Sequence, residues 1–179
     1  IKLIQQLKHE KMPNVKNIEK VLTKMEVDPS NKLTIPYQWG TSGLIVRAHE
    51  GRQIKDSWGI LFDPAQEVGG FLLFDTARDT IGSALKYLGY SFNSTNPKEI
   101  EEAVKLLVAT KKRPTFLGYD GGVAGLNKVL SGIAVAAQVY NGEAIRAQEE
   151  EPGIRYLIPE EGCEIWTDPV AIPAKATHP

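Results

Sequence analysis

A run of four apolar residues, Phe71-Leu72-Leu73-Phe74, constrains the fold of this chain more than any other feature of the sequence. A strand that is apolar at every position has both faces buried, which is typical of a parallel sheet with helices on both sides. Directly after the run, Asp75-Thr76-Ala77-Arg78-Asp79 is expected to open a helix whose apolar residues recur at helical spacing up to Leu88. Gly89 is expected to end that helix, because glycine readily adopts the left-handed conformation that follows many helices. The run and the helix together predict a unit of the α/β type.

The elements that follow also alternate between helices and strands. Asn96-Pro97-Lys98-Glu99 is a strong helix start, with Asn as the N-cap, Pro at N1 and Glu placed to close a capping box. The helix that begins there is predicted to run through Val108, with Val104 and Val108 on one apolar face. Two further helices are predicted, one near 126–130 and one over 142–150. Strands are predicted over 115–117, 133–140, 154–158, 164–166 and 170–172. This order predicts an α/β domain with a largely parallel sheet flanked by helices.

Ligands of such domains bind at the carboxyl ends of the strands. These ends are expected at Phe74-Asp75, Leu117–Asp120, Tyr140-Asn141 and Trp166–Asp168, and each carries an acidic, aromatic or amide residue. The sequence therefore places its candidate binding residues at one edge of the predicted sheet.

The first 69 residues are less regular. We expect a helix over 1–10, a short helix around Ile18–Leu22 and a turn at Asp28-Pro29-Ser30-Asn31. Leu33–Trp39 and Leu44–Val46 are predicted as two short strands separated by Gly40 and Gly43. Residues 48–69 show no periodic pattern and are expected to be irregular.

The residue inventory excludes several classes of protein. The 179 residues include 21 Lys and Arg against 22 Asp and Glu, so the chain lacks the basic excess that is typical of nucleic-acid binding. No apolar run approaches the roughly 18 residues that a membrane-spanning helix needs. Cys163 is the only cysteine, which excludes an internal disulfide, and the three histidines are scattered, so no metal site is predicted. Without a glycine-rich phosphate loop, no nucleotide or other cofactor is predicted. The chain begins Ile1-Lys2-Leu3, so no signal peptide is expected within it.

Three stretches of the sequence share their order and spacing with a known family. The first is Asp28-Pro29 followed by Ile35-Pro36-Tyr37-Gln38-Trp39-Gly40. The second is Leu72–Asp79, which continues into Leu88-Gly89-Tyr90-Ser91. The third is Tyr140–Ala144, then Pro159-Glu160-Glu161-Gly162, then Trp166-Thr167-Asp168 and Ala171-Ile172-Pro173. As an ordered set over residues 28–175, they resemble the spermidine/putrescine-binding proteins, the extracytoplasmic solute receptors of polyamine ABC transporters.

The resemblance implies a fold and a cellular role. It implies a type II periplasmic-binding-protein fold, in which two α/β lobes hold the ligand in the cleft between them. On this comparison residues 1–38 are part of the first lobe with a crossing strand, 39–167 form the second α/β lobe, and 168–179 are the strand that crosses back. Family members are longer, so the chain looks like their central portion. The resemblance further implies a monomeric receptor and not an enzyme, located in the periplasm or elsewhere outside the cytoplasm. That receptor would take a polyamine to a membrane ABC permease and would have no nucleic-acid partner.

The same resemblance carries a ligand site onto individual residues of this sequence. Asp79 and Asp168 stand at positions where the family has carboxylates, and Trp166 and Tyr140 stand at positions of aromatic side chains that pack on the ligand. Thr76 stands where the spermidine binders have a further Asp, and either Tyr119 or Asp120 lies near another contact position. Carboxylates suit the ammonium groups of a polyamine, and aromatic faces suit both its methylenes and its charges.

Structural roles compete with these assignments. Thr76 and Asp79 at a helix start also form a capping-box pattern, in which an acid stabilises the first turn. Trp166 and Tyr140 are also interpretable as packing aromatics. Trp39 is expected to pack at the crossing strands and Trp58 in the core or on the surface.

Two other functions stay open at this point. A receptor of the same fold could take another small solute, because a fold does not fix its ligand. A hydrolase could use Asp79 and Asp168 as its acid and base, as glycosidases use two carboxylates.

Overall fold

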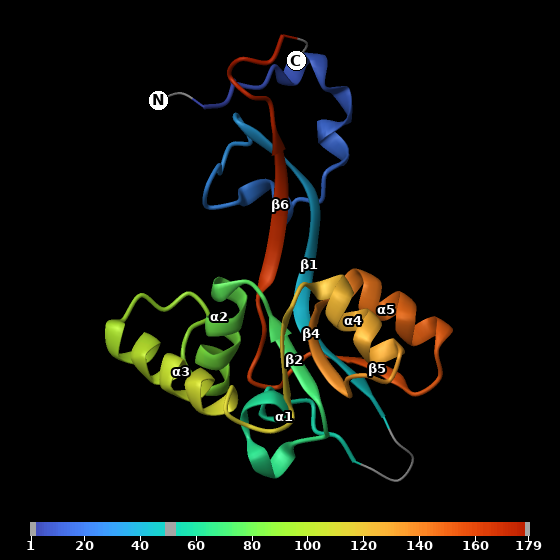
Figure 1. Cartoon of the computed structure of the whole chain (residues 1–179). Coiled ribbons are helices and arrows are strands. Elements are labelled where there is room, and N and C mark those ends of the chain that lie inside the picture. The colour runs from blue at the N-terminus through green and yellow to red at the C-terminus, as the bar shows by residue number, and fades with distance from the viewer. Residues whose placement is uncertain (1–2, 49–52, 178–179) are drawn as a thin grey trace. The chain divides into compact units, whose positions relative to one another are not determined.

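The computed structural model describes residues 3–48 and 53–177, and the chain divides into two compact units (Figure 1). Unit 1 comprises Ile1–Gly40 and Trp166–Pro179, and unit 2 comprises Thr41–Ile165. Strands β1 (Thr34–Arg47) and β6 (Ile165–Ala171) each belong to both units, and they pair with one another.

Unit 2 is built on a mixed sheet. Its strands lie in the order β3 (Phe116–Asp120), β2 (Phe71–Phe74), β4 (Ala136–Tyr140), β1 and β5 (Ile154–Leu157). Strand β2 runs parallel to β3 and β4, whereas β1 runs antiparallel to β4 and β5. Four strands therefore point in one direction and β1 is reversed among them, so the α/β class is confirmed and the sheet combines two parallel with two antiparallel pairings.

Helices cover both faces of this sheet. Helices α1 (Gly59–Phe62), α2 (Ala77–Tyr87) and α3 (Pro97–Thr110) lie on one side, and α4 (Gly122–Leu130) and α5 (Asn141–Glu150) on the other (Figure 1). Within the described residues, none of these helices has the length and apolar character that crossing a membrane requires.

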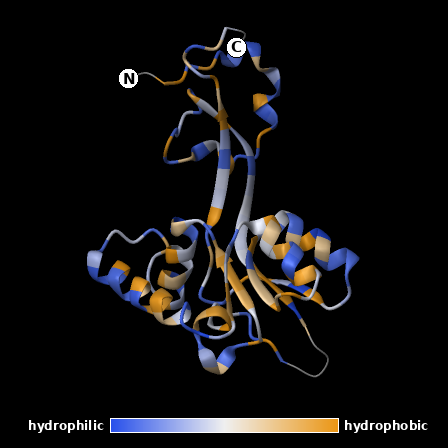
Figure 2. Ribbon diagram, in the orientation of Figure 1, coloured by the Kyte–Doolittle hydropathy of each residue, from blue (hydrophilic) through white to orange (hydrophobic). Residues whose placement is uncertain are grey.

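The core of unit 2 follows from strand alternation. Leu44, Val46 and Leu73 belong to the apolar cluster under α1, α2 and α3, whereas Ile45 and Leu72 belong to the cluster under α4 and α5. Successive side chains of a strand point to opposite faces, so a strand that is apolar throughout contributes side chains to both clusters. All four residues of β2 are buried, as the sequence predicts, and Figure 2 shows the apolar strands between the more polar helices.

The predicted ends of α2 and α3 are confirmed, with one difference in the capping. Gly89 has φ +84° and follows α2, and the Asn96 side chain accepts the Lys98 N–H at the start of α3. Glu99 does not bond the backbone of Asn96 as a capping box requires. Its carboxylate instead accepts hydrogen bonds from the side-chain amide of Asn96 and from the Ser94 hydroxyl. The backbone N–H of Asn96 donates to Ser94 Oγ.

Unit 1 differs most from the prediction. The expected helix over 1–10 is wrong for the described residues, because the Gln5 N–H donates to the Ile172 carbonyl at 2.8 Å and the Leu7 N–H to the Lys32 carbonyl at 2.8 Å. Long-range backbone pairing thus replaces local helix formation there. The helical segments of unit 1 are the short 3₁₀ helices His9–Lys11, Pro13–Asn17 and Leu22–Lys24.

The turn at Asp28 is confirmed, and its side chain explains why it forms. The buried Asp28 carboxylate accepts the N–H groups of Leu33 and Thr34 at 2.8 Å each. Burial raises the pKa of Asp28, but the hydrogen bonds from Leu33, Thr34 and Lys32 outweigh it, so the pKa lies below its usual value. The ionised side chain therefore fixes the turn that leads into β1.

Two predicted breaks between strands are absent. Gly40 and Gly43 lie inside β1, which is one strand of 14 residues, and the segments predicted at 164–166 and 170–172 merge into β6. Between 53 and 69 the prediction missed α1 and the 3₁₀ helix Pro64–Gln66. Glycine therefore marks a close approach within β1 and not a turn.

We predict that Gly43→Ala destabilises the protein by about 1–3 kcal/mol, because a Cβ would meet a rigid backbone atom. That Cβ would lie 2.5 Å from the Leu157 carbonyl oxygen, which β5 holds in place. Urea unfolding of the intact protein measures the loss. Gly142→Ala in α5 is the control: its Cβ meets nothing within 4 Å, so we expect a gain of up to about 1 kcal/mol from helix propensity. Equal effects of the two changes would contradict the account.

Candidate functional site

A buried amide fixes the carboxyl end of β2 against β4 and α2. Gln138 Oε1 accepts the Phe74 N–H at 3.1 Å, and Gln138 Nε2 donates to Ser83 Oγ at 2.9 Å. Thr80 Oγ1 donates to the Phe74 carbonyl at 2.8 Å, and the Ser83 hydroxyl donates to the Thr80 carbonyl at 2.9 Å. Each of these polar side chains is buried. Because buried polar groups are costly unless paired, this network ties the start of α2 to the sheet.

Asp79, on the first turn of α2, lies at the centre of a polar cluster. The Thr76 hydroxyl donates to Asp79 Oδ2, and the Tyr140 hydroxyl lies 3.5 Å from the same oxygen. The Thr76 side chain makes no capping bond to the helix backbone, so the predicted capping box is not formed. The structure thus brings together three of the predicted site residues.

Tyr140 ends β4 and presents an aromatic face within this cluster. Its ring stacks on Phe74 with centroids 4.8 Å apart and an interplanar angle of 30°. A Cβ on Gly122 would lie 3.1 Å from the Tyr140 ring, so the start of α4 also confines it. Burial, followed by the negative charges of Asp79 and Glu164, raises the pKa of Tyr140 to about 12. The phenol therefore stays protonated at neutral pH and is available as a donor.

Glu164 is a member of the cluster that the sequence analysis missed. Ser42 Oγ donates to Glu164 Oε1 at 2.7 Å, and the negative charge of Asp79 acts on the Glu164 carboxyl. Burial raises the pKa of Glu164, and the neighbouring Asp79 charge raises it further. A signal was present in the sequence, because Glu164, Trp166 and Asp168 follow one another at the two-residue spacing of a strand face.

Tyr119 lies next to this cluster and not within it. It lines a separate cavity of about 420 Å³ with Asp75, Thr76 and apolar residues of α2 and α3. Its neighbour Asp120 forms an ion pair with Lys128 at 2.6 Å. Asp120, the other residue that the resemblance offers at this position, is thus engaged by a protein cation. Thr76 is the residue that the cavity and the Asp79 cluster share.

The remaining predicted site residues, Trp166 and Asp168, lie on β6 in unit 1. They fall within the strand and not at its carboxyl end, which corrects the expected strand boundary. Gln38 Nε2 of β1 donates to Asp168 Oδ2 at 3.1 Å. On the other face of β1, Tyr37 and Trp39 are 72% and 56% exposed, so Trp39 is not a packed residue as expected. Unit 1 therefore also combines a carboxylate with aromatic side chains.

Trp58 behaves as expected for a core residue. It is buried, and its indole N–H donates to the Gly162 carbonyl at 2.8 Å. The hydrogen bond anchors the segment that leads to Glu164.

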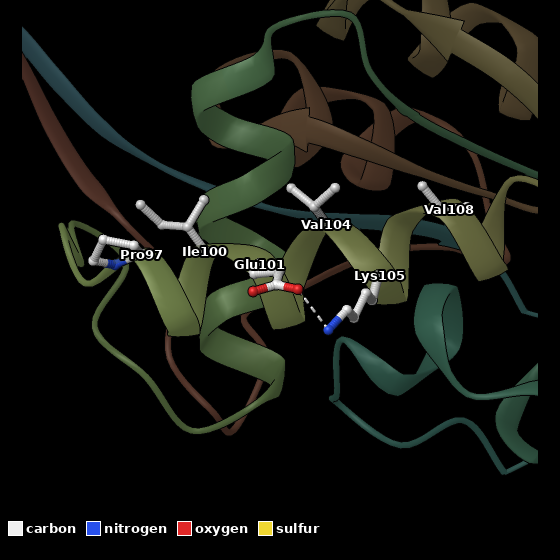
Figure 3. Close-up of a pocket in the computed structure, with 6 residues that line it drawn as sticks. All are labelled: Pro97, Ile100, Glu101, Val104, Lys105 and Val108. Carbon is white, nitrogen blue, oxygen red and sulfur yellow. Dashed lines mark ion pairs between the residues drawn. The ribbon is translucent and has the colours of Figure 1, made fainter.

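An apolar hollow on α3 is distinct from the polar cluster. It has a volume of about 540 Å³ and is lined by Pro97, Ile100, Glu101, Val104, Lys105 and Val108 (Figure 3). Val104 and Val108 are 41% and 50% exposed, so part of the predicted apolar face of α3 is open to solvent. Glu101 and Lys105 form an ion pair at 2.7 Å, so the charged groups that line the hollow neutralise one another.

The cluster around Asp79 has the chemistry of a cation site. Its carboxylates accept charge-assisted hydrogen bonds, and an aromatic face attracts cations and apolar methylenes. A ligand with ammonium groups separated by a short hydrocarbon chain matches this combination of groups.

The chain is similar to known proteins along its whole length. A family model described as bacterial extracellular solute-binding protein matches residues 1–179. The spermidine/putrescine-binding periplasmic protein of Escherichia coli is 34% identical over 178 residues, which are 98% of this chain and 50% of that protein. The putrescine-binding periplasmic protein SpuD of Pseudomonas aeruginosa is 31% identical over 190 residues, covering 97% of this chain and 52% of that protein. The chain thus spans about half the length of these relatives.

A solved structure shows the same likeness. The spermidine/putrescine ABC transporter substrate-binding protein PotD from Streptococcus pneumoniae aligns with a TM-score of 0.80 and 28% identity. The alignment covers 96% of this chain and 52% of that chain.

We predict that Gln138→Leu costs about 1–3 kcal/mol of stability, because the Phe74 N–H is left buried without an acceptor. Thermal unfolding of the intact protein measures the loss. Gln148→Leu is the control, since that amide accepts the Tyr156 N–H at an exposed position and water can replace it. A Gln138→Leu variant as stable as the control would contradict the role assigned to the network.

We predict that Asp79→Asn lowers the pKa of Tyr140 from about 12, because a negative charge beside the phenol is removed. In ¹³C-tyrosine NMR, with Tyr140→Phe to assign the signal, the onset of ionisation should move to lower pH. Glu143→Gln, at an exposed position on α5, should leave the onset unchanged. An unchanged onset in Asp79→Asn would show that the two groups are not neighbours in solution.

Proposed function

The chain belongs to the family of bacterial extracellular solute-binding proteins, and from this premise we propose that it is the ligand-binding part of a polyamine receptor. The observation that carries the proposal is the cluster of Asp79, Tyr140 and Glu164 at the edge of the unit 2 sheet. The names of the E. coli and P. aeruginosa relatives support a polyamine as the ligand.

The charge and shape of a polyamine fit the residues in question. At neutral pH its amines are protonated, since an alkyl amine such as Lys has a pKa near 10.4. We propose that Asp79 accepts hydrogen bonds from one ammonium group and that the Tyr140 ring packs on the adjoining methylenes. Trp166 and Asp168 offer the same pairing of aromatic and carboxylate on β6, which supports their assignment as ligand contacts. Thr76 and Tyr119 are proposed as neighbouring contacts that adjust the fit.

The wider role follows from the proposed ligand. We propose that residues 1–38 and 168–179 belong to one lobe of the receptor and 39–167 to the other. The receptor would work as a monomer outside the cytoplasmic membrane and deliver its ligand to an ABC permease, without catalysis. The naming of the E. coli and P. aeruginosa relatives as periplasmic binding proteins supports this location and role.

Calorimetric titration of the intact protein with putrescine and with spermidine tests the proposal. Saturable binding of either is expected, together with a loss of affinity of at least thirtyfold in Asp79→Asn, which is about 2 kcal/mol. A charge-assisted hydrogen bond and a Coulomb attraction are lost together in that variant. The monoamine 1-butylamine, which has one ammonium group, should bind more weakly than putrescine.

Glu149→Gln, an exposed acid on α5, is the matched control. It should bind both polyamines as the unchanged protein does, because an exposed and distant charge contributes little. A folded protein that binds neither polyamine would overturn the proposal. A folded Asp79→Asn variant that binds polyamine with unchanged affinity would overturn the assignment of the ligand site to the residues around Asp79.

A further inference from the structure

A cavity beside the Asp79 cluster is left without an occupant by the proposed function. It has a volume of about 420 Å³ and lies between α2, α3 and the carboxyl ends of β2 and β3. Pockets that bind small molecules have volumes of roughly 300–1,000 Å³ and carry a few polar groups on an apolar wall. Ligands of α/β sheets also bind at the carboxyl ends of the strands. Both the size and the place of the cavity therefore suit a small-molecule site.

The wall of the cavity is apolar where α2 and α3 form it. Ala77 and Ile81 line it from α2, and Val104, Leu107 and Val108 line it from α3. Val104 and Val108 stand in line along one side of α3 (Figure 3), and both are exposed. A hydrocarbon chain that covers these side chains removes apolar surface from water, which is favourable. The wall thus suits a ligand with an aliphatic end.

Five polar residues also line the cavity, and two of them already use their hydroxyls within the protein. Thr80 Oγ1 donates to the Phe74 carbonyl, and the Thr76 hydroxyl donates to Asp79 Oδ2. The second of these bonds joins the cavity to the polar cluster, because Thr76 belongs to both. A ligand whose ammonium group is bound by Asp79 can therefore extend past Thr76 into the cavity.

The other three polar residues, Asp75, Lys111 and Tyr119, are exposed and offer both acceptors and donors to a ligand. Asp75 adjoins the cluster as well as the cavity, since its charge acts on the Tyr140 phenol. The charges of Asp75 and Lys111 cancel, so the cavity has no excess of negative charge for a second ammonium group. A neutral group that carries both an N–H and a carbonyl fits these residues better. A secondary amide is such a group.

We propose that the cavity between α2 and α3 binds the acylated end of a mono-N-acylated polyamine whose free ammonium group is bound by Asp79. This inference rests on the proposed function and names the class of polyamine that the site takes. The amide N–H donates to the Asp75 carboxylate, and the amide carbonyl accepts a hydrogen bond from the Tyr119 phenol. The acyl chain covers Val104 and Val108. The binding is noncovalent throughout.

A series of putrescine derivatives with increasing acyl length tests the inference. The intact protein is titrated calorimetrically with N-acetyl-, N-butanoyl- and N-hexanoylputrescine, and with putrescine as the reference. Each methylene that leaves water in a partly open cavity strengthens binding by about two- to fourfold. The hexanoyl group has four more methylenes than the acetyl group. We therefore expect N-hexanoylputrescine to bind at least about tenfold more tightly than N-acetylputrescine.

A substitution in the wall separates the cavity from the site around Asp79. Val108→Asn places a polar amide of similar size against the acyl chain, so the gain from acetyl to hexanoyl should shrink to about threefold or less. Val108 lies outside the proposed contacts of putrescine, so the affinity for putrescine should be unchanged. Ile145→Asn is the matched control, because Ile145 is an exposed apolar residue of α5 on the other side of the sheet. That variant should keep the full gain.

NMR places the acyl chain without any substitution, which keeps the test decisive if Val108→Asn fails to fold. In the unchanged protein saturated with N-hexanoylputrescine, we expect nuclear Overhauser effects between the acyl chain and the methyl groups of Ala77 and Ile81. These two residues line the cavity and not the neighbouring hollow on α3. Effects confined to Ile100, which lines only the hollow, would place the chain outside the cavity.

The outcomes separate this inference from the proposed function. Binding of putrescine without a gain along the acyl series overturns the inference and leaves the polyamine receptor standing. The inference also fails if Val108→Asn keeps the full gain, or if the acyl chain contacts only residues outside the cavity. A folded protein that binds neither putrescine nor any of its acylated forms overturns the proposed function itself.

Discussion

The buried Gln138 amide is the interaction on which the site in unit 2 depends. It replaces backbone pairing where β2 and β4 diverge, since their register covers only Phe71 with Ala136 and Leu72 with Ala137. By bonding Phe74 on one side and Ser83 on the other, it sets α2 against the end of the sheet. The first turn of α2 carries Asp79, and the strand that holds Gln138 ends in Tyr140. One polar side chain thus positions both an acid and an aromatic ring of the candidate site.

The acids that this frame brings together are unfavourable to the empty protein. Glu164 has a raised pKa in the folded state, so the stability that its protonated form contributes is fully present below its ordinary pKa and is lost as the pH rises through the raised value. Burial and the neighbouring Asp79 charge therefore disfavour the ionised form of Glu164 in the folded protein. For Asp28 the pKa shift has the opposite direction, because backbone N–H groups hydrogen-bond its ionised form and lower its pKa. The stability that this carboxylate contributes is therefore lost only as the pH falls into the acid range. The carboxylate that holds a turn and those of the candidate site thus differ in their partners.

Local sequence signals predicted unit 2 well and unit 1 poorly. The apolar run of β2, the glycine after α2 and the Asn-Pro start of α3 all act within a few residues, and the structure confirms the elements that they indicate. Residues 3–8 carry a helical pattern, yet they form no helix, because the backbone of Gln5 bonds that of Ile172 and the backbone of Leu7 bonds that of Lys32. Such pairings join residues far apart in the chain, and no periodicity encodes them. The same reason explains Gly43, whose absent side chain admits the Leu157 carbonyl of a distant strand.

The residues of the candidate site likewise divide into those that local signals select and those that depend on long-range contacts. Asp79 and Tyr140 follow strands of the sheet, so rules for strand ends together with the family resemblance were enough to select them. Glu164 was missed because its place in the cluster arises from the hydrogen bond of Ser42 and the charge of Asp79, which come from other parts of the chain. The exposure of Val104 and Val108 was also beyond prediction, since helical periodicity gives the apolar face of α3 but not which part of it a neighbour covers.

The central claim is that the acids and the ring around Asp79 receive an ammonium group. A crystal structure of the intact protein with putrescine bound tests it most directly. We predict one ligand nitrogen within about 3 Å of an Asp79 carboxylate oxygen, a hydrogen-bonding distance, with the adjoining methylenes against the Tyr140 ring. A ligand bound elsewhere, with water alone between Asp79 and Glu164, would contradict the account.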